Sequence, residues 1–193
     1  MRLLLRFLSW LSYGTGLWHW WSRFYRRHLE GNGKKSVTLP VADTWENLEQ
    51  IIGKLEWTPD KFWPHLFDVC QSAEATWYKH LQGRPAGDCD DHAFLAASII
   101  ENSFNLSTKA TFVGLLTVLY GIKGHTVCVF KYIDNNATRY AHLSNWYNGK
   151  IQKGFNCLEN VVTEILDCKN EQLVRWSLTR IEPFTLIESK TKV

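Results

Sequence analysis

The first half of the chain spaces its apolar residues at intervals of three and four, the period of an amphipathic helix. This pattern predicts helices over about 44–55, 72–81 and 89–102. Asp43 and Glu46 form a capping-box pattern at the start of the first helix. Single residues mark further helix ends. We expect Ser72 to cap the second helix and Gly83 to end it, and we expect Pro64 to begin a short helix before it.

The second half of the chain changes to β-branched and aromatic runs, which favour strands. Strands are predicted over 109–119, 124–133, 138–145 and 172–181, with one helix over 157–168. The polar residues 134–137 predict a hairpin turn between the second and third strands. Helices followed by antiparallel strands are typical of an α+β domain.

Charge divides the chain into two parts. Residues 1–35 carry seven Lys or Arg side chains and one Glu, for a net charge of +6, and the rest of the chain has a net charge of −3. Gly31–Lys35 has the composition of a linker, so we expect a basic Trp- and Arg-rich arm over 1–35 and a folded domain over 36–193. A weakly acidic body gives no reason to expect nucleic-acid binding.

The N-terminal arm is predicted neither to be a cleaved secretory signal nor to span a membrane. Arg6 interrupts the apolar centre that a signal needs, and Arg6, Gly14, Gly16 and His19 break up a spanning window of about 20 apolar residues. Two interpretations remain open for residues 1–30. The arm lies in a membrane interface, which would make the protein peripheral, or it packs on the domain or on a partner.

The five cysteines are odd in number and irregular in spacing, without a C-x-x-C pair. This excludes a disulfide framework and a zinc ribbon, and it favours a reducing, cytoplasmic location.

The segment Gly87–His92 reads Gly-Asp-Cys-Asp-Asp-His and leads directly into an apolar helix. Asp88 is a good N-cap and Asp91 completes a capping box, which makes Cys89 the first helical residue. A helix N-terminus favours a thiolate, whereas the flanking aspartates oppose it. The thiol therefore needs a positively charged partner.

His125 is the candidate base, because it begins the strongest predicted strand. A third group should orient its imidazole. If His125 shares a face with Val127, the returning strand offers Asn145 rather than Ser144, although one residue of slip in the register would reverse the choice.

Other polar residues receive weaker assignments. Asp90, Asp91 and His92 are adjacent on a helix and should point in different directions, so we predict capping or solvated roles for them and no metal site or cofactor. We expect His142 on the strand surface, and Gln82 is assigned no role.

The blocks Gly-Asp-Cys-Asp-Asp, Gly-His-Thr-Val-Cys-Val-Phe and Leu-Ser-Asn-Trp resemble those of the transglutaminase-like superfamily, in particular the bacterial and phage transglutaminase-like cysteine peptidases. The resemblance covers about 57–180. It implies a papain-like core, with the catalytic Cys helix packed on the sheet that carries the histidine. Family members commonly have aspartate at the third position, where this chain has Ser144 or Asn145.

The sequence thus predicts a cysteine peptidase, amidase or acyltransferase with the triad Cys89, His125 and Asn145, acting on a peptide or protein amide. It does not separate hydrolysis from transamidation. The alternative hypothesis is an inactive transglutaminase-like adaptor that docks to a membrane or a partner through its arm.

Overall fold

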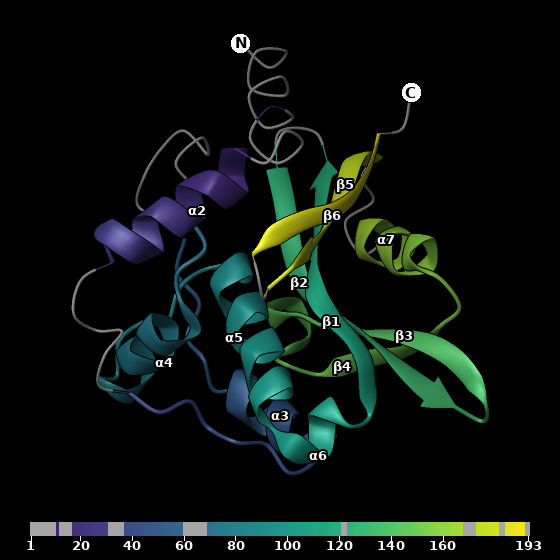
Figure 1. Cartoon of the computed structure of the whole chain (residues 1–193), viewed down its shortest axis with the longest axis horizontal. Helices are drawn as coiled ribbons and strands as arrows, with labels where there is room; N and C mark the ends of the chain where they lie inside the picture. The colour runs from purple at the N-terminus through teal and green to yellow at the C-terminus, as the bar shows by residue number, and fades with distance from the viewer. Residues whose placement is uncertain are drawn as a thin grey trace.

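A six-stranded antiparallel sheet forms the centre of the fold, with helices on both of its faces (Figure 1). The computed structural model describes residues 11, 17–30, 37–59, 69–120, 123–167, 173–181 and 184–191. The strand order is β4-β3-β2-β1-β5-β6. The strands are β1 (Ala110–Tyr120), β2 (Lys123–Asp134), β3 (Ala137–Leu143), β4 (Ile151–Phe155), β5 (Leu173–Arg180) and β6 (Thr185–Thr191).

Six α-helices are described, together with a short 3-10 helix, η3 (Asn145–Tyr147), that follows β3. The α-helices are α2 (Leu17–His28), α3 (Trp45–Ile52), α4 (Ala73–Leu81), α5 (Cys89–Asn102), α6 (Phe104–Ser107) and α7 (Leu158–Asp167). The predicted α+β class is confirmed.

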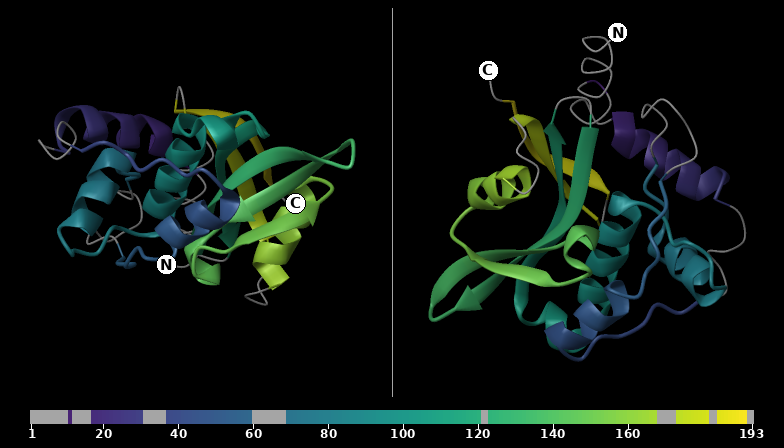
Figure 2. Two further views of the ribbon diagram at one scale, coloured as in Figure 1. Left: turned by 90° about the horizontal axis from the view of Figure 1, so that it is seen from below. Right: turned by 180° about the vertical axis from the view of Figure 1, so that it is seen from behind.

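Strand alternation divides the core into two layers. On β1 and β2, Leu115 and Cys128 belong to the cluster that contains α5, whereas Leu116 and Val127 belong to the cluster that contains α7. Helix α5 is almost entirely buried because α2, α3 and α4 surround it on its side of the sheet. Figure 2 shows α7 on the other side of the sheet.

The predicted elements are largely present, with corrections at their ends. Helix 89–102 has the predicted bounds, and Ser72 caps α4 as expected. The N-cap of α3 is Thr44 rather than Asp43, because the Thr44 side chain accepts a hydrogen bond from the Asn47 N–H. The helix expected near Pro64 lies outside the described residues.

Strands β4 and β6 were not predicted. β4 is five residues long and contains Gly154 at a φ of 96°, and the outer strand β6 is mostly half-buried or exposed. Neither segment carries a strong apolar alternation. The returning strand, predicted over 138–145, ends at Leu143 because residues 145–147 turn into η3.

Helix α2 packs against the folded body through one face. Trp18 is 1% exposed and lies against Phe184, at 5.4 Å between ring centroids. The His19 Nε2 lies 2.6 Å from Thr179 Oγ1, and Ser22 Oγ accepts a hydrogen bond from the Cys70 N–H at 3.1 Å. Of the two interpretations of the arm, packing on the domain therefore describes the inner face of residues 17–28.

Within the described residues, no helix combines the length and the apolar character that crossing a bilayer requires.

Replacement of Trp18 by alanine is expected to lower the free energy of unfolding by about 3–5 kcal/mol, because it leaves a cavity beneath α2. Trp20→Ala on the same helix is the matched control, since Trp20 is 53% exposed, and it should change the free energy by no more than about 0.5 kcal/mol. Urea unfolding measures both. Equal losses in the two variants would show that α2 does not pack through Trp18.

Candidate active site

Cys89 is the first residue of α5 and is partly exposed. Asp88 is the N-cap, and its carboxylate accepts hydrogen bonds from the backbone N–H groups of Asp90 and Asp91. The predicted capping box is present, because the Asp91 side chain in turn accepts from the Asp88 N–H at 3.4 Å. The helix N-terminus therefore directs its positive end at the thiol.

The carboxylate of Asp91 also fixes the loop beside the helix. It accepts hydrogen bonds from the Gln71 backbone N–H, at 2.7 Å, and from the Gln71 side-chain amide. Gly87 has a φ of +149°, and a Cβ there would lie 1.9 Å from an Asp91 oxygen. A side chain at position 87 would displace the carboxylate, so the glycine before the motif is required by this close approach.

Cys70, Asp90 and Asp91 form the one cluster in the described part of the chain with metal-ligand atoms close together, all within 4.8 Å. Asp91 has the capping role that was expected, but the expectation that Asp90 and Asp91 point apart is wrong, and neither they nor His92 are solvated, since all three are buried. The Asp91 oxygens already bind Gln71 and the Asp88 N–H, and the Cys70 thiol faces the carbonyl oxygens of Gln71 and Asp90. These contacts favour a structural role.

The thiol of Cys89 lies against β2 beside the predicted base. The Cys89 Sγ accepts a hydrogen bond from the Thr126 N–H at 3.4 Å, and Thr126 directly follows His125. The last pair between β2 and β3 is Cys128 with Leu143, so this contact occurs where β2 extends beyond its neighbour. A backbone N–H donated to sulfur stabilises the thiolate relative to the thiol.

The third position is Ser144, not Asn145. The His125 Nε2 lies 2.7 Å from Ser144 Oγ, which also accepts a hydrogen bond from the Trp146 N–H at 3.1 Å. The Asn145 Oδ1 is buried without a hydrogen-bond partner among the described residues. The structure thus brings Cys89 and His125 to neighbouring positions and leaves Asn145 out.

The register of the hairpin explains this correction. Asp134 pairs with Ala137 across a two-residue turn in which Asn135 and Asn136 both have positive φ. Continuing that register beyond the last pair sets position 144 opposite Val127. His125 and Val127 alternate onto one side of β2, so Ser144 rather than Asn145 lies on the side of His125. The two-residue turn was the signal that could have identified Ser144.

Trp146 covers the imidazole. Its ring is stacked on His125 with centroids 3.4 Å apart and planes within 5°. The indole limits rotation of the histidine, so the ring stays in the orientation that Ser144 binds.

His142 is buried, which corrects its expected place on the surface. Its Nε2 binds Glu164 of α7 at 2.8 Å, and the Tyr147 hydroxyl donates to the other Glu164 oxygen. This network joins α7 to β3 and to η3, on the side of the sheet that carries Ser144. Gln82 ends α4 as an exposed residue, so the glutamine next to the motif is Gln71.

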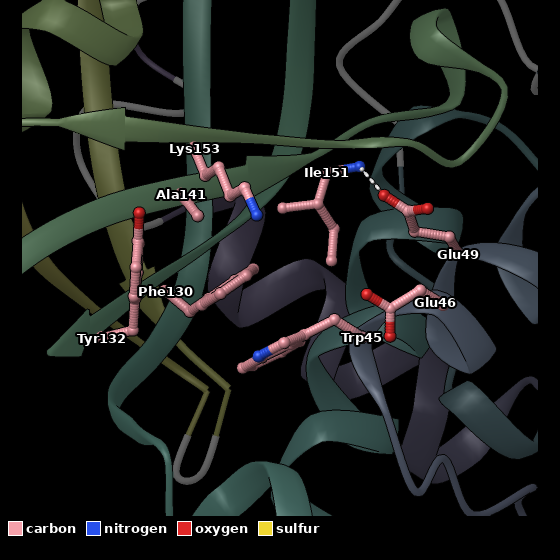
Figure 3. A pocket seen from close by; sticks show the side chains of 8 residues that line it. All are labelled: Trp45, Glu46, Glu49, Phe130, Tyr132, Ala141, Ile151 and Lys153. Atoms are coloured by element: carbon pink, nitrogen blue, oxygen red, sulfur yellow. Dashed lines mark hydrogen bonds between the residues drawn. The ribbon is translucent and has the colours of Figure 1, made fainter. Parts of the chain in front are cut away.

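A hollow lies between α3 and strands β2, β3 and β4 (Figure 3). The rings of Trp45 and Phe130, which line the hollow, are stacked with their centroids 4.7 Å apart. The side chain of Lys153 also lines the hollow (Figure 3). Glu49 is engaged by Lys150 and by the Ile151 N–H. None of Cys89, His125 or Ser144 lines this hollow, so it does not belong to the thiol site.

No family model, no curated protein and no solved structure matches this chain. The candidate site therefore stands on its own geometry.

His92 is a source of pH-dependent stability next to Cys89. Its side chain is 2% exposed, and burial lowers the pKa to about 4, with Asp88 opposing the shift. Burial, with Arg23 and Arg26 nearby, also lowers the pKa of His19 to about 4. Because both folded values lie below the unfolded value of about 6.5, the unfolded state takes up protons first as the pH falls.

The free energy of unfolding should therefore decrease as the pH falls from 6.5 to 4, with each of the two histidines contributing roughly 3 kcal/mol. His92→Gln should remove about half of that dependence, because His19 remains. Chemical unfolding across this pH range measures the slope. A slope that His92→Gln does not change would contradict the buried neutral imidazole.

Proposed function

We propose that this protein is a cysteine-dependent acyl-transfer enzyme of transglutaminase-like, papain-like arrangement, acting on a peptide or protein amide. One observation carries the proposal. The thiol at the first residue of α5 contacts the backbone of β2 next to His125, and that histidine is held by Ser144. A nucleophile beside a base, with the base oriented by a third group, is the arrangement that covalent catalysis requires.

The roles follow from the atoms in contact. Nε2 of His125 is engaged by Ser144, so Nδ1 would exchange the proton with the thiol. The Cys89 sulfur attacks the amide carbonyl carbon and forms a thioester, and the leaving amine takes its proton from His125. Water or a second amine then attacks the thioester and restores the thiol, which gives hydrolysis or transamidation respectively.

The oxyanion of the tetrahedral intermediate needs a backbone donor. The Asp88 carboxylate occupies the N–H groups of Asp90 and Asp91, so these two cannot serve. The proposal assigns this role to the N–H of Cys89 at the start of the helix. A thiol nucleophile also fits a reducing compartment such as the cytoplasm.

Ser144 is the feature that favours the second candidate, an inactive adaptor domain. A serine hydroxyl is neutral and does not stabilise an imidazolium by charge as a carboxylate does. The test must therefore measure the reactivity of Cys89 before a substrate is known.

Alkylation by iodoacetamide from pH 5 to 9, with mass mapping of each cysteine, provides this test. Cys157 is the internal control, because it is also a partly exposed free thiol. It lies outside the site, where its thiol donates a hydrogen bond to Asn160 Oδ1. Cys128 should stay unlabelled because burial raises the pKa of its thiol. Cys89 is expected to react about tenfold faster than Cys157 below pH 7, because only the thiolate reacts.

Three variants assign the roles. His125→Ala should make the alkylation rate of Cys89 equal to that of Cys157. Ser144→Ala should lower the rate of Cys89 about five- to tenfold, which corresponds to the free energy of one hydrogen bond. Asn145→Ala should leave it unchanged. If Cys89 reacts no faster than Cys157 at any pH in the wild-type protein, the enzyme is excluded and the adaptor is favoured.

A further inference from the structure

Helix α2 has a second face that the folded body does not use. Its inner face is taken by Trp18, His19 and Ser22, as described above, and Arg26 is also directed inward, with its guanidinium 4.6 Å from the Phe94 ring centroid and 4.2 Å from that of Phe184. Of the remaining residues, Trp21 and Tyr25 are half-buried, and the others are exposed: Leu17, Trp20, Arg23, Phe24, Arg27 and His28.

This outer face combines aromatic and basic side chains. Trp20 is 53% exposed and Phe24 36% exposed, and their rings are stacked with centroids 5.8 Å apart. Arg23 and Arg27 are exposed beside them. Figure 1 shows α2 at the periphery of the molecule. Large aromatic side chains exposed as a group mark a binding surface.

Charge indicates what this surface binds. The segment 1–35 has a net charge of +6, whereas the rest of the chain is at −3, and α2 itself carries three arginines and no acidic residue. Tryptophan and arginine together are favoured at the head-group level of a bilayer, where the indole is half-dehydrated and the guanidinium pairs with lipid phosphate. Each basic side chain near an anionic membrane adds to the attraction between the protein and the lipid.

We propose that the outer face of α2 docks the protein on an anionic lipid surface, with Trp20 and Phe24 inserted at head-group depth and Arg23 and Arg27 paired with lipid phosphates. The helix lies in the plane of the surface, because its inner face remains bound to the folded body through Trp18. This proposal is independent of the chemistry at Cys89.

Vesicle flotation of the full chain tests the docking. The probes are vesicles of phosphatidylcholine alone and vesicles of three parts phosphatidylcholine to one part phosphatidylglycerol. The protein should float with the anionic vesicles, and it should float weakly with the neutral ones. Raising the salt to 0.5 M should release most of it, since screening weakens the arginine contribution.

Two double variants separate the aromatic from the basic contribution. Trp20→Ser with Phe24→Ser and Arg23→Glu with Arg27→Glu should each reduce binding to anionic vesicles about tenfold or more. The matched control is Phe104→Ser, which removes an aromatic side chain that is 79% exposed on α6 and should leave binding unchanged. Circular dichroism and thermal unfolding establish that each variant is folded.

Three results would overturn the proposal. The first is the absence of flotation with anionic vesicles, and the second is equal binding by the wild-type protein and the Trp20/Phe24 variant. The third is a concentration-dependent dimer in size-exclusion chromatography that the same variant abolishes, which would assign the face to a second copy of the chain.

Discussion

The buried carboxylate of Asp91 is the constraint on which the site depends. It binds the N–H of Asp88, which closes the capping box of α5, and it binds both the backbone and the side chain of Gln71. One side chain thus joins the loop before α4 to the loop before α5. A buried carboxylate is stable only when such hydrogen bonds replace its water, so the two loops and the first turn of the helix form a single unit. Gly87 leaves the space that this arrangement needs.

The position of Cys89 follows from that unit, and the position of its partners follows from the β2–β3 hairpin. The two-residue turn at Asn135 and Asn136 fixes the register, which determines that Ser144 rather than Asn145 meets His125. Early termination of β3 then leaves the Thr126 N–H to bind the thiol. Two separate local constraints, a capped helix and a short hairpin, therefore meet at one point on β2.

The local parts of this arrangement could be predicted from the sequence. The capping residues Asp88 and Asp91, the bounds of α5 and the turn at 134–137 follow from short-range patterns. The contacts of Gln71 could not be predicted, because they join residues 20 positions apart, across helix α4 and the loop that follows it. The third site residue was assigned to the wrong position because the register of the hairpin was assumed rather than derived from the turn. His142 has the spacing of a surface residue and is buried only because α7 supplies Glu164.

The chemistry proposed here uses a neutral third residue. Ser144 orients the imidazole of His125 and Trp146 covers it. These two contacts fix the position of the ring, but neither supplies a negative charge that would stabilise its protonated form. The thiolate must then be stabilised mainly by the helix N-terminus and the Thr126 N–H, against the negative charge of the neighbouring aspartates. The central claim is that Cys89 accepts an acyl group with the help of His125.

Mass mapping after brief exposure to p-nitrophenyl acetate near pH 7 tests this claim most directly, because the activated ester replaces an unknown substrate. The account predicts an acetyl group on Cys89 that forms in a burst, is then lost by hydrolysis, and does not form in His125→Ala. Acetylation of Cys89 and Cys157 at equal rates, or no acetyl group on Cys89, would contradict it.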